Sequence, residues 1–137
     1  MKLLLATAII AAVFAAPAAA NPFDSLRWEK RLLLIFGETD GAQEAEQRRL
    51  LPEKELAARD LLVVTIPRDG KLMVPGQGSL DAAGARKAYG IAADAGFEVL
   101  LVGKDGGVKM RAKEPIQAKE LFSTVDAMPM RRQEARG

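Results

Sequence analysis

Two residue types are missing from this chain of 137 residues: it has neither cysteine nor histidine. Thiol–disulfide exchange and thiol peroxidase chemistry both need a thiolate, so the absence of cysteine excludes them. Zinc in proteins is held mainly by Cys and His, and a catalytic serine ordinarily needs a histidine base. The sequence therefore predicts no metal site, no cofactor and no catalytic residue of these kinds.

A large excess of either charge is missing as well. The whole chain has a formal net charge of +2, and removal of Lys2 with the N-terminal segment leaves 19 Lys and Arg against 18 Asp and Glu, or +1. Proteins that bind nucleic acids usually carry a clear basic excess. We therefore expect no nucleic-acid partner.

The N-terminal segment, residues 1–20, has the pattern of a secretory signal peptide. Lys2 precedes an apolar run, Leu3–Ala16, and small residues end at Ala20. We predict cleavage after Ala20, export to the periplasm or the exterior, and no stable membrane insertion afterwards. An uncleaved anchor is the alternative, although the run is short for a bilayer and Pro17 interrupts its end. Lipid anchoring is excluded because no cysteine follows.

Apolar runs and turn residues predict seven elements in the order β-α-β-α-β-β-α. Strands are expected at residues 31–36, 61–66, 97–102 and 108–113, and helices at 41–51 (with a further turn at 53–59), from Ser79 or Asp81 to Tyr89, and from Pro115 to Pro129. Residues 71–78, with two glycines and a proline, are expected to be loop. This divides the chain into a signal peptide (1–20), a lead-in segment (21–30), one domain (31–128) and a charged C-terminal tail (129–137).

This order of elements predicts the fold class. Two apolar strands joined by a helix form a right-handed crossover with parallel pairing, inside a sheet covered on both faces. The last two strands form a hairpin and a helix follows. The combination predicts an α/β, thioredoxin-like domain with a four-stranded mixed sheet. The first strand should lie between the second and third, with the fourth at the edge; another small α/β sandwich is the alternative.

The loop after the first strand, Phe36–Gly41 (FGETDG), occupies the place of the reactive cysteine pair in thioredoxin-like enzymes. There the helix dipole stabilises a thiolate. Here Glu38, Thr39 and Asp40 take that place. Asp94–Phe97 stand where those enzymes have a cis-proline, so both halves of that active site are missing.

Several uses of this loop remain open. Glu38 and Asp40 suit a hard cation, whereas Thr39 and free helical N–H groups suit an anion. In the simplest interpretation, Thr39 or Asp40 only caps the following helix. The leading hypothesis is a non-catalytic binding domain for an envelope protein or a small ligand, with Glu38, Thr39 and Asp40 as candidate binding residues. A carboxylate-based hydrolase using Glu38 or Asp40 is the alternative.

The C-terminal segment offers a second candidate site. Met128–Arg132 places two methionines around a proline, followed by Arg131 and Arg132. Methionine makes adaptable contacts and arginine binds anions with two hydrogen bonds, so this end is a candidate for binding a partner. The alternative is a helix end whose methionines cover the sheet edge. Trp28, the only tryptophan, is expected in the core beside the first strand; a cation–π surface formed with Arg27 is the alternative.

Four stretches of the sequence resemble one family. They begin at Arg27-Trp28, at Arg59-Asp60-Leu61, at Phe97 (continuing to Lys104-Asp105-Gly106-Gly107) and at Asp126-Ala127-Met128-Pro129-Met130-Arg131. Together they look like domain-of-unknown-function family 4174, over about Asp24 to Arg132. The resemblance implies a thioredoxin-like fold in small exported bacterial proteins, and a relationship to a module of animal matrix proteins with sushi repeats. It implies no established activity.

Overall fold

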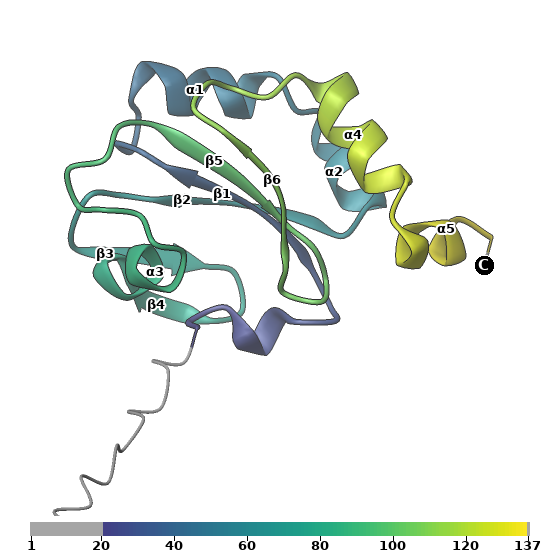
Figure 1. Cartoon of the computed structure of the whole chain (residues 1–137), viewed down its shortest axis with the longest axis horizontal. Helices are drawn as coiled ribbons and strands as arrows, with labels where there is room; N and C mark the ends of the chain where they lie inside the picture. Colours follow the sequence, from purple (N-terminus) through teal and green to yellow (C-terminus); the bar gives the residue numbers. More distant parts are fainter. Residues whose placement is uncertain (1–20, 137) are drawn as a thin grey trace, which may run out of the picture.

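The structure is a computed structural model that describes residues 21–136, so the predicted signal peptide lies outside the described residues. Four strands form the central sheet in the order β2-β1-β5-β6 (Figure 1). They are β1 (Arg31–Phe36), β2 (Leu61–Ile66), β5 (Glu98–Val102) and β6 (Val108–Ala112). β1 and β2 are parallel, with Leu32 opposite Leu62, and the other pairs are antiparallel. The predicted α/β class, the mixed sheet and its strand order are confirmed.

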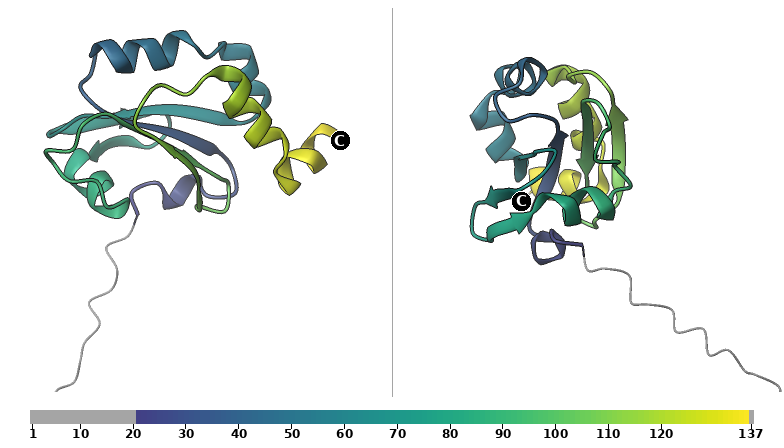
Figure 2. Two further views of the ribbon diagram at one scale, coloured as in Figure 1. Left: turned by 45° about the horizontal axis from the view of Figure 1, so that its top comes forward. Right: turned by 90° about the vertical axis from the view of Figure 1, so that its left-hand side faces the viewer.

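Helices cover both faces of the sheet, as predicted (Figure 2). One face carries α1 (Ala42–Arg49), α2 (Glu53–Ala58) and α4 (Ala118–Asp126), and the other carries the short 3-10 helix η1 (Asp24–Leu26) and α3 (Ala82–Ala88). All six residues of β1 are buried, because Leu32 and Leu34 enter one core cluster while Leu33 enters the other. The first strand is therefore the centre of the fold, and its two ends are fixed positions for a site.

The apolar face predicted for α4 is confirmed, but the helix begins later than expected. Leu121 and Val125 are buried in one core cluster. The helix starts at Ala118 rather than at Pro115, because the N–H and carbonyl of Ile116 form hydrogen bonds with a side chain instead of with the helix backbone. The buried side chain of Gln47 accepts a hydrogen bond from the Ile116 N–H at 2.7 Å and donates one to its carbonyl at 3.0 Å.

The expectation of a loop at residues 71–78 is wrong. β3 (Lys71–Val74) and β4 (Gly78–Asp81) form a separate antiparallel hairpin. Leu72 and Val74 alternate with exposed residues and pack into the core, which stabilises the hairpin. Gly76, one of the two glycines that suggest a loop, lies in the turn between β3 and β4. Its φ of 77° is a conformation that glycine adopts without strain.

The C-terminal segment expected to be a charged tail is also structured. Residues Pro129–Arg136 form α5, which follows directly after α4. Proline is favoured at the first position of a helix because its N–H would have no partner there. Pro129 therefore lies beyond the end of α4, as predicted, and also begins another helix.

Candidate functional site

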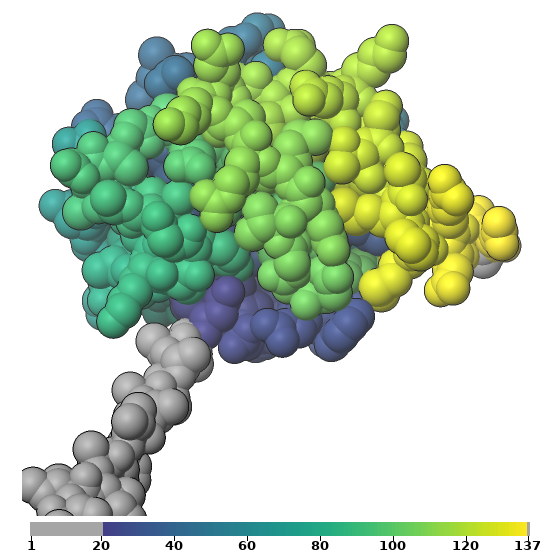
Figure 3. Space-filling view, viewed as in Figure 1, coloured from purple at the N-terminus to yellow at the C-terminus, as the bar shows by residue number. Residues whose placement is uncertain are grey.

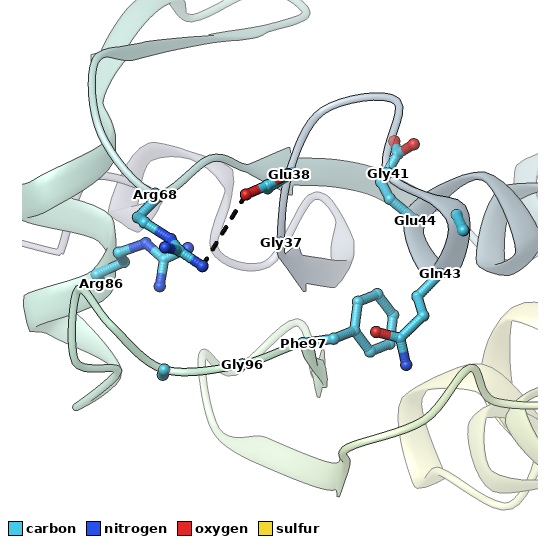
Figure 4. Close-up of a pocket in the computed structure, with 11 residues that line it drawn as sticks. Gly37, Glu38, Gly41, Gln43, Glu44, Arg68, Arg86, Gly96 and Phe97 are labelled. Carbon is cyan, nitrogen blue, oxygen red and sulfur yellow. Dashed lines mark ion pairs between the residues drawn. The ribbon is translucent and has the colours of Figure 1, made fainter.

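The loop after β1 borders a cavity at the carboxyl end of that strand (Figure 4). The cavity has a volume of about 260 Å³. It is lined by Gly37, Glu38, Gly41, Ala42, Gln43, Glu44, Arg68, Arg86, Ala95, Gly96 and Phe97. Glu38 is thus the one predicted candidate residue that lies at this cavity. Ala95–Phe97, which replace the expected cis-proline region, form part of the opposite wall.

Two arginines supply the positive charge of this cavity. Arg68 is exposed and lies 4.0 Å from Glu38, whose side chain is 75% exposed, so solvent screens the pair. Arg86 is only 4% exposed and donates hydrogen bonds to backbone carbonyls, including Pro67 at 2.9 Å and Ala92 at 3.2 Å. Burial, and then the nearby charge of Arg68, lower the pKa of Arg86. Sequence patterns gave no sign of either arginine as a site residue.

Thr39 and Asp40 do not lie at this cavity. They line a second, more open one of about 440 Å³ that runs along β2 and β3. The two carboxylates Glu38 and Asp40 therefore face different spaces and do not converge. The expectation that Thr39 or Asp40 caps α1 is wrong: Gly41 is the N-cap and no side chain caps the helix. Asp40 has a φ of 62°, a left-handed conformation that ends the loop in a tight turn.

A polar cluster around the buried carboxylate of Glu44 lines the second cavity, and local sequence patterns do not reveal it. Glu44 accepts hydrogen bonds from Arg48 at 2.5 Å and from Thr65 at 2.7 Å. Burial opposes the charged form of Glu44, but these two hydrogen bonds outweigh it and lower its pKa. The spacing of Glu44 and Arg48 by four residues is typical of a helical ion pair. Thr65 comes from β2, so only the fold adds it.

The opposite end of β1 holds a second group of charged residues. Arg31 is 1% exposed and donates two hydrogen bonds to the carboxylate of Glu134, at 3.1 and 3.0 Å. Lys104 is also buried and donates to Glu134 at 3.0 Å and to Asp60 at 2.9 Å. The hydrogen bond from Arg31 is the main cause that lowers the pKa of Glu134 to about 2; burial opposes it and Lys104 adds to it. This network joins α5 to β1 and to the β5–β6 hairpin.

Arg131 and Arg132 occupy different environments. Arg131 donates to the carbonyl of Ala58 at 2.8 Å and lies 3.4 Å from Asp126, so it is used within the fold. Asp126 also pairs with Arg59 at 2.9 Å. Arg132 is exposed, and no ion pair joins it to another residue in the range 21–136. Only Arg132 of the two is left open to a partner.

The prediction that Trp28 belongs to the core is wrong. Its side chain is 61% exposed and its backbone has a φ of 72°. The Trp28 N–H donates to the carbonyl of Lys104 at 2.6 Å, which holds the residue against the β5–β6 hairpin. An Arg side chain, Arg27, lies directly over the backbone of Gly106 in the same hairpin. The lead-in segment therefore packs on the hairpin and turns its tryptophan outward.

The stretches on which the family resemblance rests meet at this end of the sheet. Lys104 contacts both Trp28 and Asp60. Arg31 contacts Glu134, and Arg59 contacts Asp126. Segments far apart in the sequence are thus joined through one network. The loop FGETDG, at the other end of β1, takes no part in it.

Comparison with known proteins identifies a family and no relative of known activity. Within residues 21–136, no helix is both long and apolar enough to cross a bilayer. No curated protein and no solved structure matches the chain. The model of the family described as a domain of unknown function (DUF4174) matches residues 22–134. Because this match covers most of the chain, the protein belongs to the DUF4174 family.

Proposed function

We propose that this protein is an exported, non-catalytic binding domain that contacts a partner protein of the cell envelope through the surface around Trp28. We define this Trp28 surface by Trp28, Val108 and Met130, three of the four large apolar side chains most exposed among the described residues. Val108 directly follows the β5–β6 turn, and Met130 lines a small cavity with Lys104. Figure 3 displays the lead-in segment, the hairpin and α5 as neighbours on this face.

The conformation of Trp28 is the observation that carries the proposal. A left-handed backbone costs an ordinary residue about 1 kcal/mol or more, and it is unusual for a bulky one. The chain retains this conformation and leaves its one tryptophan in water, where the ring gains little. Strained backbone is found mostly at functional sites, and tryptophan is enriched among residues that dominate protein–protein binding.

The surroundings of Trp28 suit a protein partner. Exposed ion pairs flank the apolar residues: Arg27 with Asp24 at 2.9 Å, and Lys109 with Asp105 at 2.8 Å. An apolar centre with a polar, solvent-exposed rim is the usual anatomy of a protein–protein interface. Arg132 follows Met130 by two residues on α5 and faces a different cavity, so it lies outside this rim.

Two kinds of chemistry count against an enzyme. The chain contains no cysteine, so thiol redox reactions have no nucleophile. A carboxylate-based hydrolase needs an acid and a base at one reacting bond. Glu38 and Asp40 line different cavities, and both are exposed. The thioredoxin-like plan would then serve as a scaffold.

The partner test uses a photoreactive benzoylphenylalanine in place of Trp28 in living cells, with Met73 as the matched position. Met73 is the fourth exposed apolar residue, 73% exposed on β3 and away from the Trp28 surface. We expect irradiation to give a discrete protein adduct from position 28 and none from position 73. The same adducts from both positions, or none from either, would contradict the proposal.

A Trp28→Gly variant separates binding from stability. Glycine adopts a positive φ freely, so we expect the unfolding free energy to stay unchanged or to rise by about 0.5 to 1 kcal/mol. Affinity for the cross-linked partner should fall by about tenfold or more, as for an interface anchor. A variant that binds normally but unfolds more easily would assign Trp28 a purely structural role.

Export is proposed on the pattern of residues 1–20 and has its own test. We expect the protein isolated from its native cell to begin at Asn21, because Ala18 and Ala20 provide the small side chains of a cleavage site. Intact-mass measurement of the purified protein checks this. A mass that includes Met1, or a protein recovered only from the cytoplasm, would refute export by this route.

A further inference from the structure

We infer that the cavity at the carboxyl end of β1, opposite the Trp28 surface, binds a small organic carboxylate. The inference concerns Arg68, Arg86 and the N-terminus of α1, and it is independent of the partner proposed above. Two arginines line this cavity of about 260 Å³, and the carboxylates beside them do not balance their charge.

Arg86 is the most unusual of the lining residues. A buried arginine ordinarily has a carboxylate partner. Arg86 is buried, yet none of the carboxylates of residues 21–136 forms an ion pair with it. Its guanidinium donates to the neutral carbonyls of Ile66, Pro67 and Ala92. A guanidinium has five N–H groups, so two are left for a ligand.

The carboxylates that line the cavity do not neutralise it. Glu44 is already engaged by Arg48 and Thr65 on the side of the second cavity. Glu38 lies at the rim, mostly in solvent, and within residues 21–136 its carboxylate pairs only with Arg68, at 4.0 Å. Two arginines thus face one weakly paired carboxylate, and the balance favours a bound anion.

The helix N-terminus supplies donors on the other side of the cavity. No side chain caps α1, and the N–H groups of Ala42 and Gln43 donate to no backbone carbonyl of the described residues. Both residues line the cavity. Free N–H groups and the helix dipole attract negative charge. In Figure 4 the start of α1, marked by Gly41 and Gln43, lies across the cavity from the two arginines, so an anion between them would meet donors from both sides.

The remaining lining residues indicate an organic anion. Phe97 presents its ring along one wall, beside Gln43 (Figure 4). The ring packs closely on Gly37, where a Cβ would lie 3.2 Å from the Phe97 Cδ2 atom. An inorganic ion would leave this apolar wall in water, whereas a carboxylate with a hydrocarbon part would cover it. The carboxylate group also matches the fork of an arginine.

Backbone amide chemical shifts of the purified protein provide the test. Benzoate and succinate are titrated, with benzamide as the neutral counterpart of benzoate and inorganic phosphate as the counterpart without an apolar part. We expect saturable shifts at Ala42, Gln43 and Phe97 with at least one carboxylate, and none with benzamide. Stronger binding of phosphate than of either carboxylate would overturn the assignment of ligand class, and no saturable shift with any of the anions would overturn the site.

Gly96→Leu locates the site without disturbing the fold. A Cβ at Gly96 meets no atom within 4 Å, and the residue lines the cavity, so a leucine there would fill it. Gly84→Leu is the matched control, because a Cβ at Gly84 also meets open space and Gly84 does not line the cavity. We expect Gly96→Leu to abolish carboxylate binding and Gly84→Leu to leave it unchanged. Equal binding by both variants would place the ligand elsewhere.

Arg68→Gln tests the charge rather than the space. Arg68 is exposed, so its loss should not unfold the protein. We expect carboxylate affinity to fall by about tenfold, as for the loss of a charged hydrogen bond. Arg132→Gln, which also removes an exposed positive charge but outside the cavity, should have no effect. Equal affinities for the two variants would show that Arg68 does not contact the ligand.

Discussion

Replacing Glu134 by glutamine is expected to lower the free energy of unfolding by about 2 to 3 kcal/mol. The substitution leaves Arg31 and Lys104 buried without the carboxylate that both contact. Removing one partner of a buried ion pair costs more than the pair itself contributes, because the remaining charge stays out of water. The expected loss lies below the about 3 to 5 kcal/mol usual for a fully buried pair, because Glu134 is 25% exposed and Lys104 keeps its ion pair with Asp60. Urea unfolding followed by circular dichroism measures the effect.

Two further variants make this result interpretable. Glu114→Gln removes the same charge at an exposed position with no ion pair among the described residues and should change stability by less than about 0.5 kcal/mol. Arg31→Met combined with Glu134→Met should recover much of the loss, because two apolar side chains leave no isolated charge in this site. If Glu134→Gln were as stable as Glu114→Gln, α5 would not be held by this pair. Strictly additive losses in the double variant would show that the two residues do not interact.

The stability of the protein should fall when the pH is lowered from about 4.5 to about 2, and Glu134 should account for much of that fall. Its pKa in the folded protein is about 2, against an ordinary value of 4.5, chiefly because of the hydrogen bond from Arg31. A carboxyl group with a lowered pKa stabilises the fold above its ordinary pKa, and this contribution is lost as protons bind. Since each pKa unit corresponds to about 1.4 kcal/mol, the difference between 4.5 and about 2 corresponds to a loss of about 3.5 kcal/mol at most.

Other carboxylates contribute in the same direction, so a comparison isolates Glu134. Hydrogen bonds from Arg59 and from Lys109 lower the pKa of Asp126 and Asp105 respectively, and both stabilise the fold less in acid. Unfolding free energies of the native protein and of Glu134→Gln, measured from pH 7 to pH 2, should differ most above pH 4.5 and converge towards pH 2. A constant difference across this range would contradict the assigned role of Glu134.

Both predictions depend on a contact between residues 103 positions apart in the sequence. The sequence placed Glu134 in a charged tail, because local patterns give no sign of a distant partner. In the sequence, Arg31 is only the first residue of an apolar run that predicts a strand. The ion pair exists because β1 brings Arg31 to the sheet end where α5 lies. Acid stability and the docking of α5 are thus consequences of tertiary structure.

The candidate sites follow the same division. In the sequence, Glu38, Thr39 and Asp40 are candidates because they fill the place that the reactive cysteine pair has in thioredoxin-like enzymes. The fold keeps Glu38 at the cavity but sends Thr39 and Asp40 to the other side of the loop. Arg68 and Arg86 come from the segment after β2 and from α3, and only the packing of these elements brings them together. No spacing in the sequence could reveal that pair.

The sequence by itself determined the properties that depend on local pattern and composition: the absence of thiol chemistry, the three apolar strands β1, β2 and β5, their order in the sheet, and the apolar face of α4. These follow from side-chain chemistry, from continuous apolar runs bounded by turn residues, from the handedness of a crossover between parallel strands, and from the helical period of 3.6 residues. Tertiary structure alone decided that Trp28 is exposed, that Gly41 rather than a polar side chain stands at the N-cap of α1, and that Arg31 and Arg86 are buried. The reason is physical: burial, hydrogen-bond partners and left-handed turns are set by neighbours that lie far away in the chain, and such neighbours leave no periodic trace in it.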